Sequence, residues 1–109
     1  MKISVVAIAL SLTCALASLP VKSESLPQQA PPGKAPYDRV CSVCHGMEGR
    51  GDAGPGPSLV PFEREYREVL AIVREGTGEM PPIAAERLSD EAVKQIVEYL
   101  KSLNTPPAR

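Results

Sequence analysis

Two cysteines and a histidine stand close together in this chain, in the sequence Cys41-Ser42-Val43-Cys44-His45. This spacing is the attachment signature of a c-type haem. On a helical turn, residues three apart share one face, so both thiols can add to the two vinyl groups of a porphyrin. His45 would then offer a ring nitrogen to the iron. The motif predicts that Cys41 and Cys44 hold a haem and that His45 is an iron ligand.

So short a motif also allows other sites, or a chance occurrence. A thioredoxin-like redox pair needs a βαβ pattern nearby, which the sequence lacks. A zinc site needs two further ligands, yet the chain has one histidine, and its third cysteine, Cys14, lies in a predicted export signal. A disulfide between Cys41 and Cys44 needs no histidine, and an oxidising compartment favours it. The disulfide is therefore the main alternative to haem.

The first 23 residues have the pattern of a secretory signal peptide. Lys2 supplies the positive charge, residues 3–17 are mostly apolar, and small residues suited to cleavage occur at Ala17 and at Ser23. The apolar run is shorter than the roughly 20 residues of a transmembrane helix, and Cys14 matches a lipoprotein signal poorly. We therefore predict cleavage after residue 17 or 23, export to the periplasm and no stable membrane span.

Residues 24–35 are rich in proline, glutamine and alanine, which predicts a flexible linker. Residues 36–105 then form one small domain. The whole chain has no tryptophan, one phenylalanine and three tyrosines, so a haem would supply apolar volume that the core otherwise lacks. Lys and Arg number 12 against 13 Asp and Glu, with no basic stripe, and this composition argues against a nucleic-acid partner.

Apolar residues recur at helical spacing in three segments, which predicts helices over Pro36–Val43, Phe62–Glu75 and Ser89–Leu103. Gly76 suits the end of the second helix, and Ser89 suits the N-cap of the third. Between His45 and Ser58, glycine and proline are so frequent that we expect a loop without regular structure, wrapped closely around a flat ligand.

Met80 lies between Gly78 and the pair Pro81-Pro82, away from the apolar face of any predicted helix. The prolines restrict the backbone here to extended conformations. A thioether held in this way could bind iron on the side opposite His45. The alternative is a methionine that fills an apolar gap, but the haem motif upstream favours an iron ligand.

Three motifs, in this order, resemble those of class I c-type cytochromes: Cys41 to Gly46, Gly56-Pro57-Ser58-Leu59, and Gly78-Glu79-Met80-Pro81. The resemblance spans about Gly33 to Leu103. It implies a small all-α, cytochrome c-like fold of about three main helices around one covalently bound haem c. The crowded prolines before Tyr37 predict a first helix shorter than is usual for the family.

The resemblance also implies roles for individual residues. His45 and Met80 would be the axial ligands, the carbonyl of Pro57 would accept a hydrogen bond from His45, and Leu59 would pack on the haem ring. The first and last helices would cross, with Tyr99 in that contact and Gly33 and Tyr37 opposite it.

Iron with two protein ligands leaves no open coordination site, which predicts an electron carrier that is not itself an enzyme. Its partners would be redox proteins, whose identity the sequence does not give, and the acidic balance favours a basic patch on them. One alternative is a cytochrome subunit of a larger periplasmic dehydrogenase or oxidase. A second is a haem enzyme in which Met80 is labile.

Overall fold

The computed structural model describes residues 15–20, 29–52 and 54–106. Their regular elements are all helical: α1 (Lys34–Val40), α2 (Ser42–His45), the short 3-10 helix η1 (Met47–Gly49), α3 (Tyr66–Glu75) and α4 (Asp90–Ser102). The described residues contain no strand, only an isolated bridge between Thr77 and Met80. The predicted all-α fold is therefore confirmed.

Most of the predicted signal peptide, including Cys14, and residues 24–28 of the predicted linker lie outside the described residues. Within the described part, no helix has the length and apolar character needed to cross a membrane.

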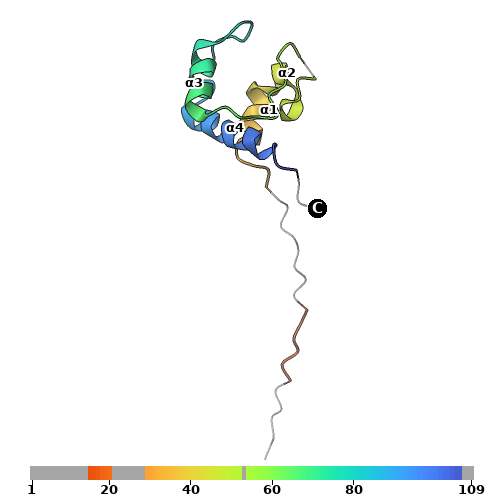
Figure 1. Ribbon diagram of the computed structural model, residues 1–109. Helices are drawn as coiled ribbons and strands as arrows, with labels where there is room; N and C mark the ends of the chain where they lie inside the picture. Colours follow the sequence, from red (N-terminus) through yellow and green to blue (C-terminus); the bar gives the residue numbers. More distant parts are fainter. Residues whose placement is uncertain (1–14, 21–28, 53, 107–109) are drawn as a thin grey trace, which may run out of the picture.

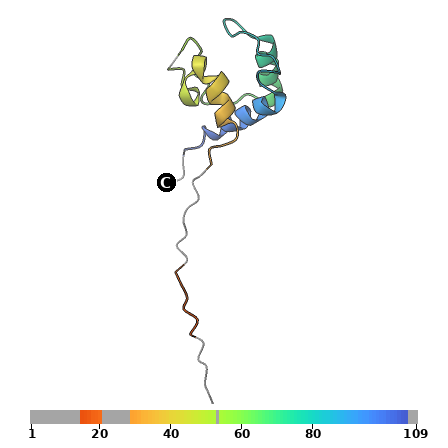
Figure 2. The same cartoon turned by 180° about the vertical axis from the view of Figure 1, so that it is seen from behind.

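Helix α4 is the element on which the rest of the fold packs (Figure 1). Helix α1 packs against it on one side and α3 on the other, and the reverse view in Figure 2 shows the same arrangement. Because α2 and η1 directly follow α1, the Cys41–His45 motif belongs to the α1 side. The loop after α3, which contains Met80, belongs to the other side. The two predicted iron ligands thus come from opposite sides of the fold.

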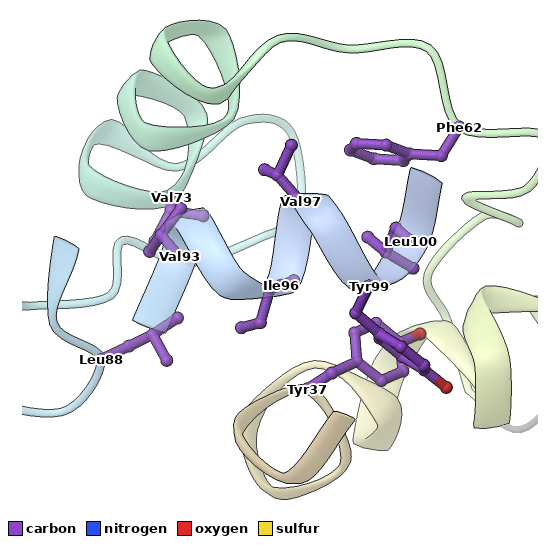
Figure 3. Close-up of a cluster of buried hydrophobic side chains, with 9 residues drawn as sticks. All are labelled: Tyr37, Phe62, Val73, Leu88, Val93, Ile96, Val97, Tyr99 and Leu100. Atoms are coloured by element: carbon purple, nitrogen blue, oxygen red, sulfur yellow. The ribbon is translucent and has the colours of Figure 1, made fainter. Parts of the chain in front are cut away.

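Apolar side chains of α4 form the centre of the hydrophobic core (Figure 3). Val93, Ile96 and Leu100, on the apolar face of α4, are at most 4% exposed. Helix α1 contributes Tyr37 to this core, and α3 contributes Val73. The buried cluster consists of Tyr37, Phe62, Val73, Leu88, Val93, Ile96, Val97, Tyr99 and Leu100.

The contact between α1 and α4 requires glycine at position 33. A Cβ atom on Gly33 would lie 1.9 Å from the backbone oxygen of Gln95, so no larger residue fits between the two helices. Tyr37 is fully buried, and its ring centroid lies 5.6 Å from that of Tyr99. The helix crossing implied by the family resemblance is therefore present, with Gly33, Tyr37 and Tyr99 at the contact.

The first helix differs from the predicted span of Pro36–Val43, because α1 begins at Lys34. The N–H groups of a first helical turn have no partner within the helix, so Pro36 is tolerated inside that turn. A break at Cys41 separates α1 from α2, yet Cys41 keeps helix-like angles (φ −92°, ψ −37°). His45 N–H also donates to the Cys41 carbonyl over 3.0 Å, so the motif does lie on a helical turn.

The second helix was predicted to begin at Phe62, but α3 begins at Tyr66. The side chain of Asn104 explains the difference. Its oxygen accepts a hydrogen bond from the Phe62 N–H over 2.7 Å, and its nitrogen donates to the Phe62 carbonyl over 2.6 Å. These two bonds hold Phe62 outside the helix while its side chain remains buried, at 5% exposure.

Two smaller differences concern the third helix and the loop after His45. Helix α4 ends at Ser102 instead of Leu103, while Ser89 is its N-cap as predicted. The loop predicted to lack regular structure contains η1, where Glu48 adopts a positive φ of 55°. A single 3-10 turn needs few residues, so it forms even in a glycine-rich segment.

Replacing Ser89 with alanine should lower the free energy of unfolding by about 1 kcal/mol, because the cap bond is lost. The Ser89 hydroxyl accepts the Ala92 N–H over 3.2 Å. Denaturant unfolding of the haem-loaded protein measures the change. Ser102→Ala is the matched control: its hydroxyl donates back to the Tyr99 carbonyl at the other end of the same helix, a bond that adds little to helix stability. Equal effects of the two substitutions would contradict the capping role.

Candidate haem site

A cavity of about 420 Å³ lies between the α1 and α3 sides of the fold. This volume is in the range of known cofactor sites. The cavity is lined mainly by apolar groups from α1, α2, α3, α4 and the loops between them. All six residues predicted to bind the cofactor line it, namely Cys41, Cys44, His45, Pro57, Leu59 and Met80.

Cys41 and Cys44 are free thiols at the junction of α1 and α2. Burial, with a smaller contribution from Cys44, raises the pKa of Cys41 to about 11. The Cys41 thiol is therefore neutral at pH 7 and is not poised to attack a disulfide. The described residues also contain no group of three or more His, Cys, Asp or Glu that could hold a metal ion. Neither the disulfide, which was the main alternative, nor a zinc site gains support from this geometry.

The ring of His45 is oriented by the loop that follows it. Its Nδ1 atom lies 2.9 Å from the carbonyl oxygen of Pro57, as the family resemblance implies. A carbonyl can only accept, so Nδ1 is the donor, and in the neutral imidazole the lone pair that a metal needs is then on Nε2. His45 lines the cavity. The side chain is thus in the tautomer that suits an iron ligand.

Glycine at position 56 allows the loop to approach the motif this closely. A Cβ atom there would lie 2.8 Å from both the Cys44 carbonyl oxygen and His45 Nδ1. The N–H of Gly56 donates to that same Cys44 carbonyl over 2.8 Å. A larger residue would push the loop away and separate Pro57 from the histidine.

Tyr37 fastens the start of the same loop to α1. Its hydroxyl donates to the Gly46 carbonyl over 2.8 Å in a buried position. Burial raises the pKa of Tyr37 to about 12, so the hydroxyl stays protonated and remains a donor at physiological pH. Further along, the Leu59 N–H donates to the Gly49 carbonyl over 2.7 Å, which places Leu59 at the cavity wall.

Met80 closes a tight turn after α3. Thr77 and Met80 exchange two backbone hydrogen bonds, of 3.0 Å and 2.9 Å. Gly78, between them, has a positive φ of 55°, which favours glycine. Met80 is partly buried, packs against the core and lines the same cavity as His45.

Residues 28–100 match the protein family described as "Cytochrome C oxidase, cbb3-type, subunit III". This chain belongs to that family and is a class I c-type cytochrome. Cytochromes of this class bind haem c, and electron transfer is therefore the function of this one. The predictions of fold family and of electron transfer are confirmed.

The cytochrome is similar to a subunit of a known dehydrogenase. It is 38% identical over 77 residues to the 4-cresol dehydrogenase [hydroxylating] cytochrome c subunit of Pseudomonas putida. That alignment covers 71% of this chain and 65% of the relative, so the chain spans less than two thirds of that relative's length.

Two crystal structures of p-cresol methylhydroxylase, one with substrate bound, are similar to the cytochrome in fold. Each matches it with a TM-score of 0.57 and 37% identity over 64% of this chain. The matches cover 90% and 89% of the solved chains.

The donors around the cavity of this cytochrome fit haem c. Two free thiols are adjacent to an imidazole with an available nitrogen, and a thioether from another segment lines the same apolar space. These are the groups that attach and ligate a c-type haem. Two charged side chains, Arg64 and Glu79, also line the cavity. Neither of them was identified from the sequence as a site residue. Arg64 stands in no recognisable motif, and Glu79 lies in the Gly78-Glu79-Met80-Pro81 motif, in which only Met80 was assigned a role.

Proposed function

We propose that this cytochrome carries one haem c, bound covalently through Cys41 and Cys44, and transfers electrons in the periplasm with His45 and Met80 as axial ligands. The observation that carries the proposal is the single cavity lined by all four of these side chains. The hydrogen bond between His45 and Pro57 supports the ligand role of His45, because it occupies Nδ1 and orients the ring with Nε2 available to a metal.

When bound, the haem supplies a one-electron iron couple. His45 and Met80 would hold the iron, which would leave no coordination position for a substrate, and the thioether would favour a raised reduction potential. The mostly apolar lining would limit the access of water to the bound haem. No residue has to act as an acid, a base or a nucleophile, so the cytochrome is proposed to be an electron carrier and not an enzyme.

The optical spectrum of the purified mature protein, oxidised and reduced, tests the proposal. Covalent haem that persists on a stained denaturing gel, together with a low-spin spectrum, is the expected result. A colourless chain with a Cys41–Cys44 disulfide would refute it.

The similarity to a dehydrogenase subunit favours a more specific role. We propose that the cytochrome accepts electrons as a subunit of a larger periplasmic dehydrogenase, because a relative with 38% identity is named as the cytochrome c subunit of a dehydrogenase. Purification from the native periplasm should then yield the cytochrome together with a second polypeptide in a constant ratio. A monomer that is reduced by several unrelated donors would instead support a freely diffusing carrier.

Replacing Met80 with alanine should open one axial position of the iron. The variant is expected to bind carbon monoxide when reduced and cyanide when oxidised, at neutral pH without denaturant. Its reduction potential should fall by at least about 59 mV, a tenfold change in a one-electron equilibrium. Met47→Ala is the control, because Met47 follows the same motif but is 52% exposed and does not line the cavity. An unchanged spectrum in Met80→Ala would show that Met80 is not a ligand.

A further inference from the structure

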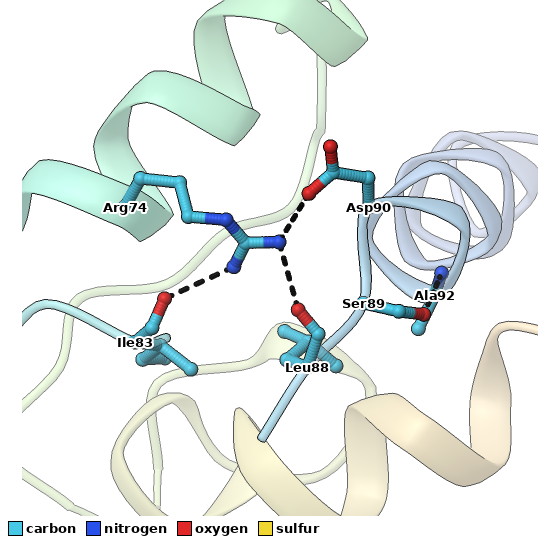
Figure 4. A network of polar contacts seen from close by, with 6 residues as sticks. All are labelled: Arg74, Ile83, Leu88, Ser89, Asp90 and Ala92. Atoms are coloured by element: carbon cyan, nitrogen blue, oxygen red, sulfur yellow. Dashed lines mark hydrogen bonds and ion pairs between the residues drawn. The ribbon is translucent and has the colours of Figure 1, made fainter. Parts of the chain in front are cut away.

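Arg74, in the last turn of α3, makes three contacts beyond its own helix (Figure 4). Its Nη1 donates to the Ile83 carbonyl over 3.0 Å, and its Nη2 donates to the Leu88 carbonyl over 2.8 Å. Nη2 also forms an ion pair with the carboxylate of Asp90. The side chain of Arg74 is only 23% exposed. One guanidinium thus joins α3 to the segment that leads from Met80 into α4.

These contacts fix one end of the loop that contains Met80. The Ile83 N–H donates to the Val73 carbonyl over 2.7 Å, next to the Arg74 bond. At the other end, the Gly76 N–H donates to the Ile72 carbonyl over 2.8 Å. Both ends of the loop from Gly76 to Ile83 are therefore bound to the last turn of α3.

Within the loop, few interactions hold the backbone in place. The backbone bonds between Thr77 and Met80 close the turn but do not tie it to the rest of the fold. Pro81 and Pro82 have no N–H to donate, and Glu79 is exposed. Besides the packing of its own side chain against the core, the position of Met80 at the cavity therefore depends on where the two loop ends are held.

We propose that Arg74 is a positioning residue for Met80: by binding the Ile83 and Leu88 carbonyls, it keeps the thioether at the cavity. This inference rests on the proposed role of Met80 as an iron ligand. A planar guanidinium can donate to two carbonyls in fixed directions, whereas a lysine ammonium is a point donor on a flexible stem. The two carbonyl acceptors around Arg74 therefore suit an arginine better than a lysine.

The two carbonyl bonds matter more than the ion pair. Asp90 is 61% exposed, and ion pairs in contact with solvent contribute little. Leu88, in contrast, is 1% exposed, so its surroundings offer little water to replace a lost donor. Neutralising Asp90 should therefore leave Met80 in place, while removing the guanidinium should release it.

Cyanide binding to the oxidised, haem-loaded protein at neutral pH tests this inference, because cyanide enters when Met80 leaves the iron. Arg74→Gln is expected to raise the cyanide-binding rate at least tenfold under conditions where circular dichroism shows a folded protein. Arg74→Lys, which keeps the charge, should raise it at least threefold. Arg67→Gln, which changes an exposed arginine of the same helix, and Asp90→Asn should both stay within twofold of the parent protein.

A double substitution separates positioning from general stability. If Arg74 acts through Met80, adding Arg74→Gln to Met80→Ala should change the cyanide-binding rate less than twofold. A parent-like rate in Arg74→Gln, or in Arg74→Lys if the first variant does not fold, would overturn the inference. If Met80→Ala itself does not accelerate cyanide binding, the proposed ligand role of Met80 fails, whatever the Arg74 variants show.

Discussion

Replacing Cys41 and Cys44 together with serine is expected to abolish covalent haem, so the exported variant gives no band on a haem-stained denaturing gel. Serine hydroxyls do not form the thioether bonds that attach a c-type haem. The variant should also fail to fold cooperatively. Without haem, an apolar cavity of about 420 Å³ between the α1 and α3 sides is left without the group that fills it. The core then loses packing on both sides of the cavity, and domains of this size have little stability to spare.

Ser42→Ala is the control for this experiment, because Ser42 lies between the two cysteines. Its hydroxyl donates to the Asp38 carbonyl and does not line the cavity. This variant should keep its haem. Each single cysteine variant should keep at most one covalent bond and lose more haem during denaturation than the parent protein. Undiminished staining in the double variant would contradict attachment through these thiols.

Replacing Gly33 with alanine is expected to lower the free energy of unfolding by about 3 kcal/mol or more, at the upper end of the overpacking range. The added Cβ would lie 1.9 Å from the Gln95 oxygen and 2.4 Å from the Gln95 carbonyl carbon. Both are backbone atoms in the middle of α4, which cannot rotate away as a side chain can. Denaturant unfolding of the haem-loaded protein measures the loss.

Gly78→Ala is the matched control, because Gly78 is required for its positive φ and not for a close contact. At Gly78 a Cβ would meet nothing within 4 Å, but φ is +55°. The expected loss there is about 1 kcal/mol, from backbone strain alone. Gly33 has an ordinary φ of −76°, so its effect comes from the contact with α4. A loss at Gly33 no greater than that at Gly78 would show that α1 and α4 can move apart.

Features encoded by neighbouring residues could be predicted from the sequence. The Cys41–His45 spacing lies on a helical turn, Ser89 caps α4, and Met80 lines the cavity as expected for its position between glycines and prolines. Each depends on hydrogen bonds or spacings within a few residues. The cavity itself also follows from the shortage of large aromatic side chains, which leaves room for a cofactor.

Features that depend on distant partners could not be predicted. The apolar pattern of the second helix extends back to Phe62, but Asn104, far along the chain, holds the Phe62 backbone outside α3. Arg74 follows the pattern of a solvated helix face, whereas it reaches across to Ile83 and Leu88. In both cases a polar side chain binds backbone groups whose positions only the folded chain determines.

The hydrogen bonds between Asn104 and Phe62 also limit how far the chain can be truncated at its C-terminal end without disturbing the fold. The family match ends at residue 100, and α4 ends at Ser102, so either boundary would exclude Asn104. A shortened protein that stopped there would free the segment between Leu59 and α3, which forms part of the cavity wall through Phe62 and Arg64. Any shortened form of this cytochrome should therefore extend past Asn104, even though residues 103–106 belong to no regular element.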